Sequence, residues 1–114
     1  MKFMVILKAT KDSEAGVLPT IEQMTTMGTY NEEMAKAGVL LDAAGVQASS
    51  KGARVRFSGT KRTVIDGPFT ETKELIAGFW IIQVRSREEA IEWVKRVPNV
   101  WREDTELEIR QVFE

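Results

Sequence analysis

Hydrophobic residues recur along this chain with two different periods, and these periods predict its strands and helices. Alternation with a period of two, or a short continuous apolar run, favours a β-strand. Strands are therefore predicted at Lys2–Ala9, Val39–Gln47, Ala53–Gly59, Thr63–Phe69, Ala77–Ser86 and Thr105–Phe113. Polar residues with Gly and Pro predict a loop at Thr10–Pro19 and a turn at Ser49–Gly52.

A helical period predicts a long first helix at Thr20–Ala37. Thr20 is a good N-cap, Gln23 follows it at the spacing of a capping box, and Gly38 is a good C-terminal stop. The apolar positions make one stripe along this helix. They are Ile21, Met24, Met27, Tyr30, Met34 and Ala37.

A shorter second helix is predicted between Ser86 and Pro98. Ser86 is its N-cap, Glu89 is the capping-box partner, and Pro98 ends the helix because proline cannot continue the hydrogen-bond pattern. The stretch Ala53–Gly59 alternates arginines with Val55 and Phe57. One face of the predicted hairpin is therefore expected to be exposed to solvent.

The order of the elements is β-α-β, a hairpin, and then β-α-β. Without the hairpin this order is βαββαβ, which is the ferredoxin-like split unit. We therefore expect one α+β domain over residues 1–114, with an antiparallel sheet, both helices on one face and an inserted β-hairpin.

The strand at Ala77–Ser86 has large apolar side chains on both of its faces. Phe79, Ile81 and Gln83 lie on one face of the strand, and Trp80, Ile82 and Val84 lie on the other. The helices cover only one of these faces. The other would be a large exposed apolar patch in a monomer, so we predict a homodimer that covers it with a second copy.

Composition excludes several classes of protein. The chain has 114 residues and a net charge of −1. It therefore lacks the excess of basic residues that is typical of a nucleic-acid-binding surface. It has no apolar run long enough for a transmembrane helix. The apolar run at the N-terminus is too short for a signal peptide, so we expect a cytoplasmic protein with no membrane partner.

The chain has no Cys and no His. Thiolate nucleophiles, disulfides and Ser-His or Cys-His triads are therefore excluded. Zinc, copper and nickel sites depend on imidazole or thiolate ligands, and the acidic residues lack the spacing of a calcium loop. The chain also lacks a Gly-rich phosphate loop. We expect no zinc or other metal, no haem, no bound nucleotide and no other cofactor.

One segment has a specific pattern, VIDGPFTETKE at residues 64–74. DGPF at 66–69 and ETKE at 71–74 are followed by GF at 78–79, EA at 89–90, Trp93 and Pro98. This pattern resembles the YCII-related, DGPF-type family. The opening MKFMVILK and the stretch EEMAKAGVLLDAAGVQ fit the same pattern, so the resemblance covers nearly the whole chain.

The resemblance implies a dimeric α+β barrel of ferredoxin-like halves in a bacterial cytoplasmic protein. Some members resemble partners of extracytoplasmic-function sigma factors, so a sigma factor or another regulatory protein is an implied partner. In related YCII proteins a His on the first helix pairs with an Asp near the sheet. That His would fall close to Met27, and its absence here argues against His–Asp elimination chemistry.

Asp66 has two interpretations. It is either a turn residue whose carboxylate accepts backbone N–H groups, or a pocket carboxylate that acts as a general base. Tyr30 and Lys73 are the candidate acids beside it. The simpler interpretation places Tyr30 in the core and Lys73 in a solvated turn. The predicted ligand-binding set is Met27, Asp66, Phe69, Glu71 and Lys73.

Two functions of different class follow from these residues. The first is a small binding or regulatory module that holds a small molecule or a protein partner without turnover. The second is a lyase- or isomerase-like enzyme with Asp66 as its general base. The absence of His favours the first.

Overall fold

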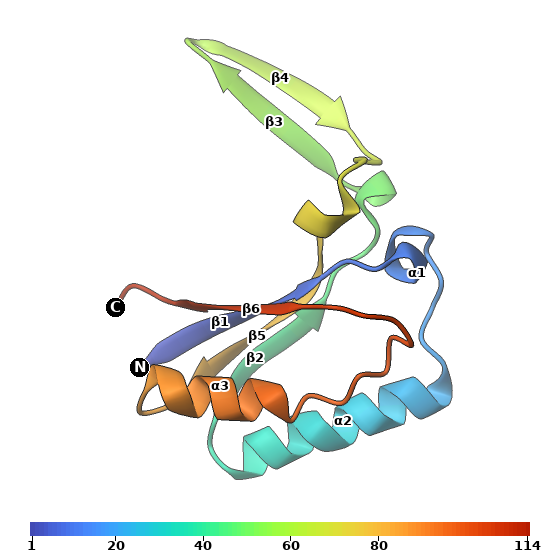
Figure 1. Cartoon of the computed structure of the whole chain (residues 1–114). Helices are drawn as coiled ribbons and strands as arrows, with labels where there is room; N and C mark the ends of the chain where they lie inside the picture. The colour runs from blue at the N-terminus through green and yellow to red at the C-terminus, as the bar shows by residue number, and fades with distance from the viewer.

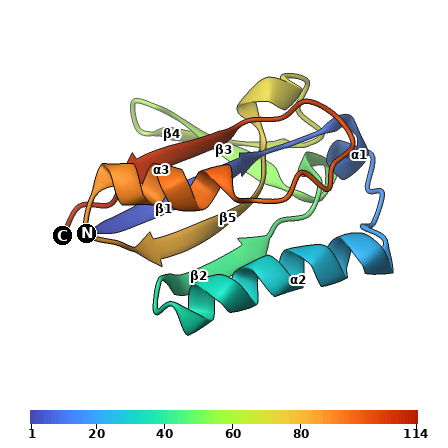
Figure 2. The ribbon, with the colours of Figure 1, turned by 60° about the horizontal axis from the view of Figure 1, so that its bottom comes forward.

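The structure, a computed structural model, describes residues 1–114 and contains a four-stranded antiparallel sheet with the strand order β2-β5-β1-β6. Its strands are β1 (Lys2–Lys8), β2 (Leu40–Gly45), β5 (Ile76–Gln83) and β6 (Leu107–Gln111). Two helices, α2 (Ile21–Lys36) and α3 (Arg87–Lys95), lie on the same side of the sheet (Figures 1 and 2). The predicted α+β, ferredoxin-like arrangement is confirmed.

The first helix begins as the sequence predicts. The Thr20 hydroxyl accepts a hydrogen bond from the Gln23 backbone N–H at 3.1 Å, and the Gln23 side chain accepts one from the Thr20 N–H at 2.8 Å. Both orphan donors are thus satisfied. At the other end Gly38 has φ +73°, a conformation that glycine adopts without a steric penalty.

Two local predictions were wrong. Thr10–Pro19 is not only loop, because it contains the short helix α1 (Lys11–Glu14), which Thr10 and Ser13 cap reciprocally. In α3 the Ser86 hydroxyl accepts from the Glu89 N–H at 3.1 Å, but the Glu89 carboxylate accepts from Arg85 N–H instead of Ser86. A helix start offers several nearby free N–H groups, and the carboxylate took a neighbouring one.

Several element ends also differ from the prediction. The second hairpin strand, β4, is Lys61–Asp66 and not Thr63–Phe69, β5 ends at Gln83, and β6 is shorter than Thr105–Phe113. The predicted turn at Ser49–Gly52 contains a 3-10 helix, η1 (Ser49–Lys51).

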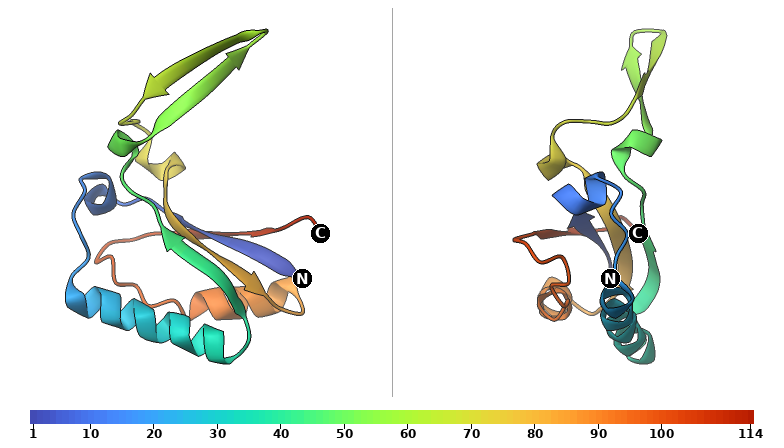
Figure 3. Two further views of the ribbon diagram at one scale, coloured as in Figure 1. Left: turned by 180° about the vertical axis from the view of Figure 1, so that it is seen from behind. Right: turned by 90° about the vertical axis from the view of Figure 1, so that its right-hand side faces the viewer.

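The core lies between the helices and one face of the sheet. Its buried residues are Phe3, Val5, Tyr30, Met34, Val39, Trp80, Ile82, Val84 and Ala90. The strand residues of this group alternate with half-exposed side chains on the opposite face, which include Met4, Ile6, Phe79 and Ile81. That second face, the open face of the sheet, has no helix over it (Figure 3).

The hairpin of β3 (Ala53–Ser58) and β4 projects from the sheet and its helices as a separate two-stranded unit (Figures 1 and 3). We call Ala53–Asp66 the arm and the four-stranded sheet with its helices the body. All residues of the arm except Ile65 are exposed. The expectation that only one face of the hairpin meets solvent was therefore wrong, because Val55 and Phe57 have nothing to pack against.

Candidate functional site

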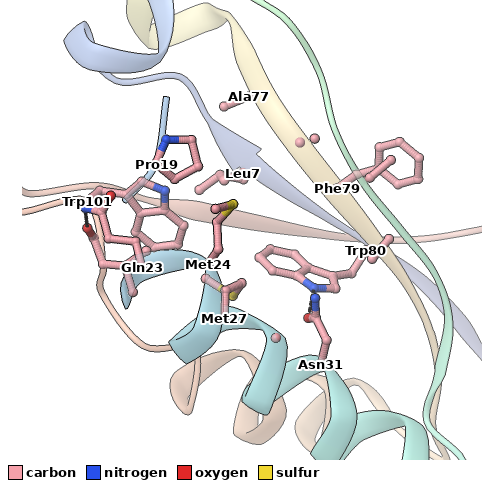
Figure 4. Close-up of a pocket in the computed structure, with 16 residues that line it drawn as sticks. Leu7, Pro19, Gln23, Met24, Met27, Asn31, Ala77, Phe79, Trp80 and Trp101 are labelled. Atoms are coloured by element: carbon pink, nitrogen blue, oxygen red, sulfur yellow. Dashed lines mark hydrogen bonds between the residues drawn. The ribbon is translucent and has the colours of Figure 1, made fainter. Parts of the chain in front are cut away.

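A cavity of about 410 Å³ lies between α2 and strands β2 and β5. In Figure 4 Met24 and Met27 of α2 lie between the indole rings of Trp80 and Trp101. Backbone or side-chain atoms of sixteen residues line the cavity: Leu7, Pro19, Gln23, Met24, Met27, Gly28, Asn31, Ala43, Ala44, Gly45, Ala77, Gly78, Phe79, Trp80, Val100 and Trp101.

The sheet side of this cavity is open because its residues are small. Ala43 is paired with Trp80 and Gly45 with Gly78, so little side-chain volume stands beside the indole. At Gly78 even a Cβ atom would lie 2.8 Å from the Ala44 carbonyl oxygen. This contact is closer than packed atoms tolerate, so β2 and β5 approach each other only with glycine there.

No lining residue carries an acidic, basic, hydroxyl or thiol side chain. The flexible thioethers of Met24 and Met27 and the two indoles instead make an apolar, polarisable wall. Such a cavity can hold an uncharged ligand by contact and dispersion. It offers no side chain that accepts or delivers a proton near neutral pH.

Two amide side chains are the polar groups of the lining. Gln23 is fully engaged at its oxygen by Thr20 and donates from Nε2 to the Val100 carbonyl at 2.6 Å. This bond joins the start of α2 to the segment that carries Trp101. Gln23 therefore holds the wall of the cavity together, because both ends of its amide are already bonded within the chain.

Asn31 is different because one half of its amide is free. Its Oδ1 accepts a hydrogen bond from Trp80 Nε1 at 2.8 Å. An indole N–H is only a donor, so this contact fixes which end of the amide faces Trp80. The Asn31 NH2 group has no hydrogen-bond partner within the chain, and Asn31 is half-buried at the cavity wall. It is an unused amide donor at the cavity wall.

A second cavity of about 600 Å³ adjoins the first and extends toward α1. The two share part of their lining, including Pro19, Gln23 and Trp101. The second is more polar, since Asp12 and Lys51 contribute to its wall. The structure brings together no group of three or more acidic side chains that could hold a metal ion.

Of the sequence-predicted site residues, Met27 lines the first cavity. Tyr30, one turn further along α2, is buried in the core instead, where its hydroxyl donates to the Trp93 carbonyl at 2.7 Å. Burial raises the pKa of Tyr30 to about 12, against an opposing effect of Arg96. The phenol therefore joins α2 to α3 and lines neither cavity.

Asp66, Phe69, Glu71 and Lys73 lie together at the root of the arm, outside the lining of both cavities. Asp66 is exposed at the end of β4, and Lys73 is exposed in the short 3-10 helix η2 (Thr72–Glu74). The structure thus separates this group from Met27. Any catalytic or binding role for these residues stays a prediction.

The DGPF segment fastens the arm to the body. The Phe69 N–H donates to Ser49 Oγ at 3.0 Å, and the Glu14 carboxylate accepts from both the N–H and the hydroxyl of Ser49. A Cβ atom at Gly67 would overlap the Ser49 carbonyl oxygen, so glycine is required there. The Gly67–Pro68 peptide bond is cis.

The Phe69 ring makes a further contact at the root of the arm. The Arg54 guanidinium lies over it at 3.8 Å from the ring centroid, in cation–π geometry. Asp66 to Phe69 therefore has a clear structural role in setting the base of the hairpin.

The comparison with known proteins supports this fold. The sequence matches the family of YCII-related domains over residues 1–114. The chain belongs to the YCII-related domain family. An uncharacterized protein of Rhizobium meliloti is 32% identical to it over 76 residues, which are 67% of this YCII-related chain and 61% of that protein. The matched stretch thus spans less than two thirds of the relative's length.

A solved structure has the same fold. It is 5-chloro-2-hydroxyhydroquinone dehydrochlorinase from Burkholderia phenoliruptrix in complex with 2,5-dihydroxybenzoquinone. The match has a TM-score of 0.56 and 14% identity, and it covers 99% of the YCII-related chain and 94% of that chain. At this level of identity the likeness shows a shared fold. No helix of the YCII-related chain has both the length and the apolar character needed to span a membrane.

Sequence reasoning missed Asn31 and Trp101 as lining residues. Asn31 is a polar residue one position after Tyr30 on a helix whose apolar stripe was the visible signal. Trp101 lies in the stretch between α3 and β6, which has no period to interpret. An isolated Trp in an irregular segment is a weak signal, although a large aromatic residue there usually finds an apolar surface to cover.

Proposed function

We propose that this YCII-related protein is a small-molecule binding module whose ligand occupies the cavity between α2 and strands β2 and β5. One observation carries the proposal: the cavity is formed by methionine, tryptophan and small apolar residues, with no ionisable side chain in its lining. Concave, mostly apolar sites with a few placed polar groups are typical of ligand pockets. A charged ligand would lose its hydration there without gaining a counter-charge.

The ligand class follows from the walls. The volume of about 410 Å³ suits a ring-sized molecule, and the indoles of Trp80 and Trp101 favour a flat one. The free NH2 group of Asn31 favours a ligand with a carbonyl oxygen, which accepts that hydrogen bond. The shared fold with an enzyme solved in complex with 2,5-dihydroxybenzoquinone supports a ring-shaped, carbonyl-bearing class.

Methyl NMR tests this proposal with matched small molecules. The protein is labelled at the methionine methyl groups and titrated with acetophenone, with ethylbenzene and with benzoate. Acetophenone should shift Met24 and Met27, which line the cavity, and leave buried Met34 unmoved. Ethylbenzene lacks the acceptor and should bind about fivefold more weakly, since one hydrogen bond is worth about 1 kcal/mol. Benzoate should bind worst because it is charged.

Two variants sharpen the result. Ala43→Leu fills the space beside Trp80 and should abolish the shifts. Asn31→Leu keeps an apolar wall of similar size and should remove the preference for acetophenone over ethylbenzene. Shifts that spread evenly over all methionines, or an Ala43→Leu protein that still binds, would refute the cavity as the site.

The enzymatic alternative keeps Asp66 as a general base, with Lys73 at the same root of the arm as the acid, because the Tyr30 hydroxyl is buried in the core and donates to Trp93. The one observation in its favour is that the fold neighbour is an enzyme. Asp66→Asn decides it: an intact fold with loss of turnover of a candidate substrate would support catalysis. Unchanged turnover would leave Asp66 as a residue of the arm's root.

We also propose a cytoplasmic homodimer that covers the open face of the sheet. Met4, Ile6, Phe79 and Ile81 are half-exposed there, and a second copy would remove them from water. A regulatory role beside an extracytoplasmic-function sigma factor is the further proposal that the family resemblance supports. Co-purification of a sigma factor with the tagged protein from its own host would test that role, with an arm-root variant as a comparison.

A further inference from the structure

The apolar face of the arm has no partner within its own chain. Val55 and Val64 are paired directly across the hairpin, and Phe57 continues the same face along β3. These side chains are 56%, 66% and 69% exposed in that order. A hairpin standing alone is only marginally stable in water. An exposed apolar face on such a hairpin is suited to packing against another surface.

The same chain carries an exposed apolar hollow. The second cavity, beside α1, is lined by Val17 and Leu18, which are 56% and 84% exposed. Ile21 follows at the start of α2 and is 79% exposed. The arm points away from α1 and α2 of its own chain (Figures 1 and 3). The arm therefore does not reach the second cavity of its own chain. A second copy of the chain can place its arm there.

The distribution of charge also favours contact between the arm of one copy and the body of another. The arm has a net charge of +3 within a chain whose total is −1, so the rest of the chain carries −4. No arm residue takes part in an ion pair within the chain. Asp12 on the cavity wall and Glu22 in the first turn of α2 are exposed and also unpaired, whereas Lys51 on the same wall opposes them. Opposite net charges steer two copies into this contact.

We propose that the arm of one copy docks into the second cavity of another copy. Phe57 enters beside Val17 and Leu18, and Arg62, whose guanidinium lies 4.1 Å from the Phe57 ring centroid, faces Asp12. We place this contact in the same two-fold dimer that covers the open face of the sheet: each copy gives one arm and receives one, so the assembly closes at two. This contact goes beyond ligand binding in the first cavity and does not depend on it.

Sedimentation equilibrium tests the apolar part of the contact. Phe57→Asp/Val64→Asp changes two exposed residues of the arm, and Phe113→Asp, at a residue that is 103% exposed outside the arm, is the matched control. The wild type should be a dimer, and the double variant should raise its dissociation constant about tenfold or more, because two apolar side chains leave the contact. Phe113→Asp should leave the constant unchanged.

A wild type that stays monomeric at micromolar concentration would overturn the proposal, and so would a double variant that dimerises like the wild type. Unfolding curves of each variant show that the body is intact. Assembly beyond the dimer into long polymers would contradict two-fold closure.

A charge exchange locates the docking site. Arg62→Glu alone and Asp12→Arg alone should each weaken the dimer several-fold, because each brings like charges together. The combined variant should recover most of the wild-type affinity, and high salt should reduce the difference among the four proteins. If the combined variant is as weak as the worse single variant, the arm does not dock at Asp12.

Discussion

The body and the arm use the same kinds of residue in opposite ways. In the body, alternation along β5 places Trp80 and Ile82 against the helices, where they are 6% and 1% exposed. In the arm, alternation along β3 is equally regular, yet Phe57 is 69% exposed. The difference is the presence of a covering layer, because a strand becomes part of a core only where another element lies over it.

The two regions also differ in what holds them. The body is joined by packing between layers and by side-chain bonds between helices, such as Tyr30 to Trp93. The arm has its own hairpin hydrogen bonds and is fastened only at its root, through Ser49, Gly67 and Phe69. A region held at one end is free to meet a partner, whereas the body must keep its shape to form a cavity.

The largest effect should come from truncating a core side chain. Ile82→Ala removes a side chain that is 1% exposed and should lower the free energy of unfolding by about 2–5 kcal/mol. Val64→Ala in the arm, at 66% exposed, should lower it by less than about 0.5 kcal/mol in dilute monomeric protein. Urea unfolding of both variants gives the comparison. Equal losses would mean that the arm folds as part of the body.

The next effect concerns the root that joins the two regions. Gly67→Ala would place a Cβ atom onto the Ser49 carbonyl oxygen and should cost about 1–3 kcal/mol or displace the arm. Gly52→Ala is the matched control, because its Cβ would lie 3.6 Å from the same oxygen, an ordinary contact. It should change stability by less than about 0.5 kcal/mol. Thermal unfolding and amide exchange at Phe69 report the two outcomes.

The smallest effect should be the pH dependence contributed by Tyr30. Its pKa is about 12 in the folded protein against a usual 10.0, so the folded state binds the phenolic proton more tightly. Its contribution to stability is complete below pH 10 and is lost as the pH rises through 12. Tyr30→Phe should remove this dependence and cost about 1 kcal/mol below that range.

Tyr30 is the one tyrosine of the chain, so ultraviolet absorbance follows its ionisation without overlap from another phenol. A midpoint near 10 in the folded protein would mean that the hydroxyl is exposed and that the bond to Trp93 is absent.

The fold was largely predictable from the sequence because its signals are local. The capping residues Thr20 and Ser86, the stop at Gly38 and the period of each segment act over a few residues. The match to the YCII-related family over residues 1–114 agrees with the same arrangement. The local errors fall at the ends of elements and at α1, where several short-range hydrogen bonds compete. The exposure of both faces of the arm was a larger error, because it depends on whether another element covers the hairpin.

The site was less predictable because it depends on which distant segments meet. Sequence reasoning grouped Met27 with Asp66, Phe69, Glu71 and Lys73, because the last four belong to the DGPF-type segment and Met27 lies close to the position where related proteins have a His. The tertiary structure instead places Met27 opposite Trp80 and Trp101. The cavity forms because the small residues of β2 and β5 lie opposite α2. The hydrophobic period of a single segment does not show which other segment it will pack against.

The sequence by itself determined the order of the main strands and helices and the absence of His and Cys. The need for glycine at position 67 comes from the tertiary structure, because the Ser49 carbonyl oxygen lies where its Cβ would be. Only the tertiary structure decided that Asn31 turns one half of its amide to Trp80 and leaves the other half free, and that Val55 and Phe57 find no cover in their own chain. The physical reason is range: backbone preferences and helix caps act between neighbours, whereas burial and unpaired hydrogen-bonding groups are properties of the whole packed chain.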